Sequence, residues 1–154
     1  MPERVPLRLY GQASDKPALD WAWVDGQLAA AGTYWVTART NGHPHPRPVW
    51  GVWRSDHLYL SIGTPMTTSA LVTDPRVTVH LDSGTDVVIV EGIRTGTSAD
   101  ADVIADYDRK YDWRYDVGAY GPLSCVVPER VLAWRTSGFA GRDSFQQTGR
   151  WRFT

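Results

Sequence analysis

Short strand-like segments separated by tight turns run through most of the sequence, and this pattern most narrows the folds open to the chain. The segment from Thr33 to Arg39 is rich in β-branched and aromatic residues, and Asn41-Gly42 after it is the strongest short-range signal for a hairpin turn. A second segment, about His45 to Arg54, is followed by the turn residues Ser55-Asp56 and then by His57 to Ile62. These three predicted strands are therefore neighbours, which indicates antiparallel pairing.

Four later segments complete the predicted set of strands. Two of them, Arg76 to Leu81 and Val87 to Thr97, flank a turn at Asp82 to Asp86 and form a second predicted hairpin. The last two, Ser124 to Arg135 and Ser144 to Phe153, lie near the end of the sequence. About seven strands, mostly joined by tight turns, predict a mainly β fold with short helices in which antiparallel strands close into a barrel.

The first part of the sequence contains an arm and a helical pattern. Residues 1–17 show no period and are predicted to form an irregular arm, and a leading helix is predicted over residues 18–31. Trp21, Val24 and Leu28 give this helix an apolar face. Asp15 is its expected N-cap, Pro17 suits its first turn, and Gly32 is expected to end it. Gly26 inside the pattern weakens the helix.

Two more helices are predicted between strands. The first runs from Met66 to Val72, with Thr64 as the expected cap and Pro65 at the first position. The second runs from about Ala99 to Trp113, with Ser98 as the expected cap. It has an apolar face of Val103, Ile104, Tyr107 and Tyr111 and an acidic face, expected to be solvated, of Asp100, Asp102, Asp106 and Asp108.

Length and composition limit the classes of protein that fit. The 154 residues, 42% of them hydrophobic, suit a single domain over residues 1–154. A formal net charge of -1 provides no field for nucleic acid or an anionic membrane, and no apolar run approaches the roughly 20 residues that span a bilayer. The chain starts without a secretory signal pattern, and its single Cys125 excludes an intramolecular disulfide, so we expect a cytoplasmic protein.

Familiar catalytic and metal-binding patterns are missing. His43 and His45 would share one face of a strand, but no further ligands have suitable spacing, so we interpret both as turn-flanking residues rather than a metal site. Cys125 has no recognisable base partner and is interpreted as a small buried thiol. The sequence also lacks the glycine-rich, P-loop and nucleophile-elbow motifs of dinucleotide-binding proteins, P-loop nucleotide hydrolases and α/β-hydrolases.

Several segments carry a family resemblance by their order and spacing. They are Gly42-His-Pro-His-Pro-Arg-Pro-Val-Trp-Gly-Val-Trp53, Leu58-Tyr-Leu-Ser-Ile-Gly-Thr64, Asp74-Pro-Arg-Val77, Val88-Ile-Val-Glu-Gly92 and Thr148-Gly-Arg-Trp-Arg-Phe153. The chain resembles the pyridoxamine 5'-phosphate oxidase-like, flavin-binding split-barrel superfamily, especially its actinobacterial branch with users of the deazaflavin coenzyme F-420. The resemblance implies a six- to seven-stranded antiparallel split barrel, usually a homodimer with cofactor sites at the interface.

The same resemblance implies roles for individual residues. Arg47 matches the arginine that meets the cofactor phosphate, a role that suits a planar bidentate donor, although a surface ion pair is the plainer alternative. Pro48, Val49 and Trp50 would line the isoalloxazine ring. Ser61 and Ile62 would pass beside the ribityl chain, and Trp151 would approach the cofactor of the partner subunit.

One feature departs from the resemblance. Proteins that hold FMN or F-420 commonly place a lysine in the short helix after the third strand, where this sequence has Pro65-Met-Thr-Thr-Ser69. The chain contains only Lys16 and Lys110, and neither is close in sequence. Hydroxyl groups in this segment, Thr67 and Thr68 among them, together with free amides at the helix start, would have to hold the phosphate.

These observations support two functional hypotheses and leave a third open. The first is a homodimeric oxidoreductase that uses FMN or F-420 for hydride transfer to a small organic substrate, with no acid/base side chain needed for that step. The second is a non-enzymatic split-barrel binder of a coenzyme, a haem or another planar ligand, with a degenerate phosphate site. A purely structural or interaction module is the third. Oxidation of pyridoxamine phosphate itself is not expected, because Arg150-Trp-Arg152 replaces the Arg-x-His arrangement for that substrate.

Overall fold

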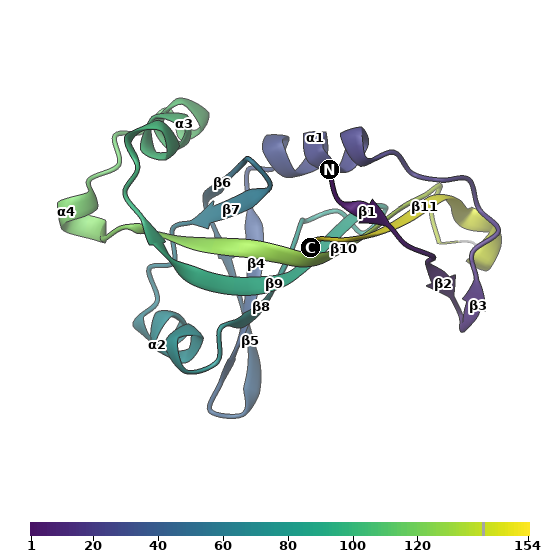
Figure 1. The fold of residues 1–154 in the computed structure, drawn as a ribbon, viewed down its shortest axis with the longest axis horizontal. Helices are drawn as coiled ribbons and strands as arrows, with labels where there is room; N and C mark the ends of the chain where they lie inside the picture. Colours follow the sequence, from purple (N-terminus) through teal and green to yellow (C-terminus); the bar gives the residue numbers. More distant parts are fainter. Residues whose placement is uncertain (140) are drawn as a thin grey trace.

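Antiparallel strands dominate the structure, a computed structural model that describes residues 1–139 and 141–154 (Figure 1). Eight longer strands carry the architecture: β4 (Tyr34–Thr40), β5 (His43–Val49), β6 (Gly51–Arg54), β7 (His57–Leu60), β8 (Arg76–His80), β9 (Asp86–Ser98), β10 (Leu123–Thr136) and β11 (Phe145–Arg152). The predicted mainly β fold is therefore confirmed.

The strands close into a ring through a break at Trp50. Strand β5 pairs with β4, whereas β6, which starts directly after Trp50, pairs with β7. Strand β7 pairs with β10, and the ladder returns from β10 through β9 and β8 to β4. The long β10 also pairs with β11 along its second half. The chain thus changes its pairing partner at Trp50, and this change completes the antiparallel barrel.

A row of buried side chains crosses five strands and forms the centre of the core. Val36, Val79, Val90, Val131 and Trp151 lie opposite one another from β4 to β11, and none is more than 4% exposed. Directly opposite residues have their side chains on the same face of a sheet, so this row defines the inner side of the barrel. The alternation of buried and exposed residues along β4 and β8 follows from it.

The helices are α1 (Trp21–Ala30), α2 (Pro65–Thr73), α3 (Ala101–Tyr111) and α4 (Val117–Tyr120), and a 3₁₀ turn, η1, spans Gly141–Ser144. Helix α2 packs against β4, and α3 packs against β6 (Figure 1). The predicted position of Pro65 in the first turn of α2 is confirmed, although the Thr64 side chain makes no capping hydrogen bond. No helix in the described residues is long and apolar enough to cross a membrane.

The predicted strand over residues 45–54 is wrong as a single element. It is divided at Trp50 into β5 and β6 because the two parts pair with different neighbours. The third predicted strand also ends earlier than expected, at Leu60, so Ser61 and Ile62 lie in the segment that leads to α2.

Short paired strands interrupt the predicted irregular arm over residues 1–17. The arm contains β1 (Glu3–Arg4), which pairs with β11, and a small hairpin of β2 (Arg8–Leu9) and β3 (Gln12–Ala13). The Ser14 hydroxyl lies 2.8 Å from that of Thr148. Strand β1 pairs with a strand near the other end of the chain, so the local sequence carries no period that reveals it.

Two predicted helix starts were placed too early. Helix α1 begins at Trp21 with Asp20 as its cap, instead of Asp15, because residues just after Pro17 bond to Thr148 on β11. Helix α3 begins at Ala101 with Asp100 as its cap, because Ser98 is still part of β9. Helix α3 ends at Tyr111, and left-handed Asp112 follows it, so Trp113 lies outside the helix.

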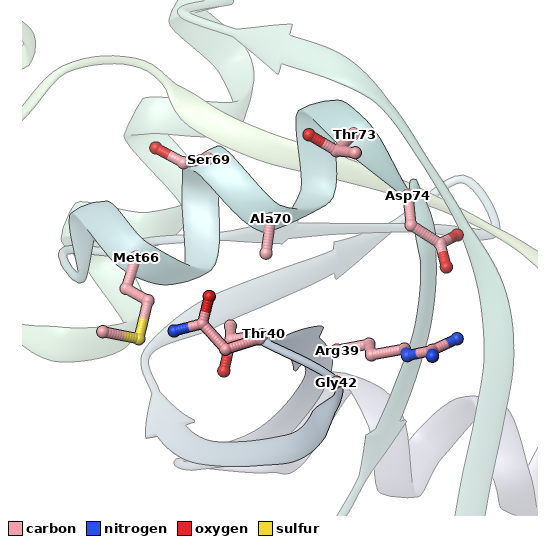
Figure 2. Close-up of a pocket in the computed structure, with 9 residues that line it drawn as sticks. Arg39, Thr40, Gly42, Met66, Ser69, Ala70, Thr73 and Asp74 are labelled. Carbon is pink, nitrogen blue, oxygen red and sulfur yellow. The ribbon is translucent and has the colours of Figure 1, made fainter.

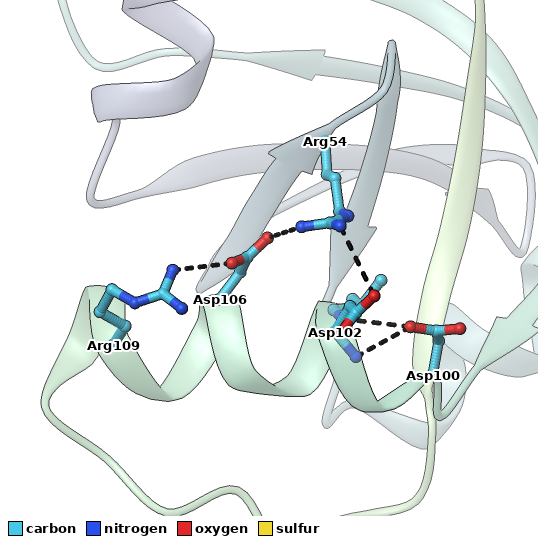
Figure 3. A network of polar contacts seen from close by, with 6 residues as sticks. Arg54, Asp100, Asp102, Asp106 and Arg109 are labelled. Carbon is cyan, nitrogen blue, oxygen red and sulfur yellow. Dashed lines mark hydrogen bonds and ion pairs between the residues drawn. The ribbon is translucent and has the colours of Figure 1, made fainter.

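The acidic face of α3 is less solvated than predicted, because part of it anchors the helix to β6 (Figure 3). The Asp106 carboxylate accepts a hydrogen bond of 2.5 Å from Arg54 and one of 2.8 Å from Arg109. The hydrogen bond from Arg54 lowers the pKa of the Asp106 carboxyl below its usual value. On the opposite face, Tyr107 and its neighbours form a second buried cluster over β6.

Candidate functional site

The predicted cofactor strand, β5, presents its side chains to two sides. Arg47 and Val49 lie opposite the buried Val36 and Tyr34 of β4, which places them on the inner side of the β4–β5 ribbon. Pro48 is exposed between them. The structure therefore groups Arg47 with Val49 and separates both from Pro48.

Arg47 has few partners in its own chain. Its side chain is exposed and donates one hydrogen bond of 2.7 Å to the carbonyl of Pro46. No ion pair among the described residues includes it. The alternative of a surface ion pair therefore finds no support, and most of the guanidinium donors remain available for an anion.

Two buried polar atoms near this region have no partner. Thr67 is fully buried in the first turn of α2, and its Oγ1 has no hydrogen bond. The Nε2 of His45 is also buried without a partner, and His45 lies two residues before Arg47 on the same side of β5, opposite Ala38. Thr68 uses its hydroxyl to donate to the Pro65 carbonyl at 3.0 Å. Five buried side-chain atoms of the described residues have no partner, and these two lie on β5 and in the first turn of α2.

The segment after β7 connects the strand break to α2. The Ser61 amide donates to the Trp50 carbonyl at 2.9 Å, so these two predicted site residues lie together. Ile62 packs against the main core. The Trp50 ring, which is 47% exposed, stacks on the Tyr111 ring of α3 with centroids 4.5 Å apart and planes 5° from parallel. One face of the indole is therefore already covered by α3.

Two cavities open near the tip of the β4–β5 hairpin. One of about 490 Å³ opens between α2 and the tip of the β4–β5 hairpin (Figure 2). Another of about 520 Å³ continues along β4, β8 and β9 and shares Arg39, Gly42 and Asp74 with the first. None of the predicted site residues lines either one. Sequence reasoning missed these lining residues, although Asp74 belongs to the Asp-Pro-Arg segment that carried the resemblance.

Lys110 reaches the strand break from the end of α3. Its Nζ donates to the Tyr34 hydroxyl at 2.8 Å and to the Gly51 carbonyl at 2.9 Å. It also lies over the rings of Tyr34 and Tyr111, 4.7 and 5.4 Å from their centroids. Burial lowers the pKa of the Lys110 ammonium to about 8 and raises the pKa of the Tyr34 phenol. The fold thus brings a lysine to the end of β5 although the sequence offered none nearby.

Similarity to known proteins is found in structure and not in sequence. No protein-family model and no curated protein matches the chain. A putative pyridoxamine 5'-phosphate oxidase from Listeria innocua matches with a TM-score of 0.57 and 17% identity, over 73% of this chain and 94% of its own. An FAD-binding protein from Mesorhizobium loti matches with a TM-score of 0.57 and 16% identity, over 86% of this chain and 94% of its own. The chain has the pyridoxamine 5'-phosphate oxidase-like split-barrel fold. A structure named F420 reductase shares this fold, with a TM-score of 0.56 and 14% identity over 68% of this chain and 93% of its own.

Trp151 occupies the core of this split barrel. It is 2% exposed and packs against Trp21 of α1, with ring centroids 5.3 Å apart. Its ring is covered within its own chain. The resemblance implied that Trp151 approaches the cofactor of the partner subunit, and this role stays a prediction.

The residues around β5 and α2 include polar groups with the chemistry to bind an anion. They provide one unpaired guanidinium, two orphaned polar atoms and a helix start whose cap residue makes no side-chain bond. Among the described residues, no group of three His, Cys, Asp or Glu side chains could hold a metal ion.

Proposed function

We propose that this protein binds FMN or the deazaflavin coenzyme F-420 and transfers hydride between it and a small organic substrate. The observation that carries the proposal is the set of unpartnered polar groups on a split barrel: the Arg47 guanidinium, His45 Nε2 and Thr67 Oγ1. Some solved structures with this fold are named as an FAD-binding protein and an F420 reductase. Ligands of that kind carry the phosphate that these groups can bind.

The proposed division of labour suits the residues present. The cofactor supplies the hydride chemistry when bound, and the protein supplies binding, orientation and polarity. Arg47 binds the phosphate, and the inner side of β5 at Val49 with the exposed face of Trp50 provides apolar surface for a ring. No side chain with a general acid or base role is required at this level of the mechanism.

Titration with the two cofactors tests this function. Wild-type protein is expected to bind FMN or F-420 with a dissociation constant of about a micromolar or less. Arg47→Ala is expected to weaken that affinity roughly 10- to 100-fold, because it removes a charge-assisted hydrogen bond. Quenching of cofactor fluorescence measures both. The matched control is Arg8→Ala. Arg8 lies on β2 and, like Arg47, donates one hydrogen bond to a backbone carbonyl, that of Gly11. Absence of binding of either cofactor by the wild type would contradict the proposal.

We also propose that the active form is a homodimer. A second cross-strand row, on the outer side of the sheet, runs through Trp35, His80, Ile89, Leu132 and Arg150, and each of these side chains is only partly buried. The three large apolar members of this row, Trp35, Ile89 and Leu132, favour contact of this outer face with a second copy. Such contact would also cover the cavity along β4, β8 and β9.

The dimer is testable without any cofactor. Ile89→Asp places a charge in the middle of the outer row and is expected to shift the protein to a monomer in sedimentation velocity experiments. Thr95→Asp is the control, because Thr95 is exposed on the same strand but outside the row. A wild-type protein that sediments as a monomer at all accessible concentrations would refute the homodimer.

A binder without enzymatic activity remains the second candidate, and one observation favours it. The first turn of α2 contains Pro65, Met66, Thr67 and Thr68 and no cation, so Arg47 is the only positive side chain that we assign to the phosphate. A protein that binds FMN or F-420 but transfers no hydride to or from the bound cofactor would match this second function. A purified protein that takes up haem and neither cofactor would match it as well.

A further inference from the structure

Strand β5 is a free edge of the large sheet. It pairs with β4 on one side, and no strand in the described residues pairs with it on the other. Five of its seven residues are exposed, and its hairpin with β4 projects from the barrel at the bottom of Figure 1. The unpaired N–H and C=O groups of such an edge are ordinarily a template for pairing with another extended chain.

Three prolines decide which backbone groups β5 presents on its free side. Pro44, Pro46 and Pro48 occupy alternate positions of the strand. In an antiparallel pair, residues that exchange hydrogen bonds with the neighbouring strand alternate with residues whose N–H and C=O groups point away from it. A proline has no N–H to donate, so the three prolines take the second kind of position and the residues between them pair with β4.

Two further observations agree with this assignment. The hairpin closes through a two-residue turn, Asn41-Gly42, with both residues at positive φ, so Thr40 and His43 beside it form a hydrogen-bonded pair. Counting from His43, the odd-numbered positions of β5 then face β4. The Pro46 carbonyl accepts a hydrogen bond of 2.7 Å from the Arg47 guanidinium, which suits a carbonyl that points away from β4.

The free side of β5 can therefore accept hydrogen bonds but cannot donate them, and we call it the acceptor-only edge. It presents the carbonyls of Pro44, Pro46 and Pro48 and no N–H from residue 43 to residue 49. A strand beside it would direct its own carbonyls at proline rings. Those carbonyls would lose water and gain no donor, which is unfavourable.

We propose that the acceptor-only edge closes this side of the sheet to extended polypeptide segments, including β5 of a second copy of this chain. The exclusion is strongest for two copies that meet edge to edge at β5, because neither edge supplies a donor. The inference does not depend on a cofactor. It directs contact between copies to a face of the sheet, such as the outer row through Ile89, and away from this edge.

The test restores donors to the edge. Pro44→Thr combined with Pro46→Thr adds two N–H groups on the free side and uses a residue that favours strands. The matched control, His43→Thr combined with His45→Thr, adds the same side chains at positions whose amides already face β4. In sedimentation velocity, we expect the proline variant to at least double its weight-average mass at concentrations where the wild type and the control keep theirs. Hydrogen exchange of the new amides should be fast in dilute protein and slow in the assembled protein.

Each other result overturns the inference. An unchanged mass of the proline variant does so whatever the oligomeric state of the wild type. Slow exchange of the amide at position 46 in dilute protein does so as well, because that amide would then pair with β4. Addition of Ile89→Asp to the proline variant should leave the larger species intact, and their loss would assign them to the outer row instead. If the double variant does not fold, Pro46→Thr alone is measured in the same way and decides.

Discussion

Replacement of Trp151 by alanine is expected to lower the free energy of unfolding by about 3–5 kcal/mol. Trp151 ends the inner row that crosses the sheet from Val36, and its ring fills the space between β11 and α1. The fit against its own strand is close, because a Cβ built on Gly149 would lie 2.1 Å from the ring. A close-packed core relaxes only partly into the space that the indole would leave.

Urea unfolding measures this effect, and Trp113→Ala is the matched control. Trp113 is 49% exposed and makes an edge contact with Trp50, with centroids 6.5 Å apart, so its loss should change stability by less than about 1 kcal/mol. A small effect of Trp151→Ala on stability, combined with a large loss of cofactor affinity, would instead support the role toward a partner's cofactor.

The sequence predicted those strands whose apolar and polar residues follow a regular pattern along their length. Strands β4 and β8 alternate apolar and polar residues because one side faces the core throughout, and that alternation is visible without any structure. The break at Trp50 was not visible. The residues from Val49 to Trp53 remain apolar and aromatic across it, while the pairing partner changes from β4 to β7. The local sequence pattern predicts which residues of a strand are buried, but it does not predict which neighbouring strand pairs with it.

The residues of the candidate site also divide into those that the sequence identified and those that it did not. Arg47 was recognisable because a guanidinium in a particular motif has a chemistry of its own. His45 was interpreted as a turn-flanking residue, and only the register opposite Ala38 places it on the same side as Arg47. Lys110 could not be assigned, because it is 59 positions from Gly51 in sequence and reaches it only after α3 has packed on β6. Residues that meet through tertiary packing carry no local signal.

The replacement of Gly92 by alanine is the second large effect that we expect, a loss of about 2–3 kcal/mol in the free energy of unfolding. Gly92 is buried on β9 where β10 shifts its register next to Pro128. A Cβ built on Gly92 would lie 2.4 Å from the Val127 carbonyl oxygen and 3.1 Å from the Pro128 Cα. Both contacts are with backbone, so a rotamer change cannot relieve them and the two strands would have to separate.

Gly26→Ala is the matched control for Gly92→Ala, since it adds the same methyl group where there is room. Gly26 lies exposed inside α1, and nothing lies within 4 Å of a Cβ built there. This substitution should raise the free energy of unfolding by about 0.5–1 kcal/mol, because alanine loses less conformational entropy in a helix than glycine does. Urea unfolding of both variants measures the contrast in sign. Equal stability of the two variants would mean that β9 and β10 do not approach each other closely at Gly92, which would contradict the closed barrel at this point.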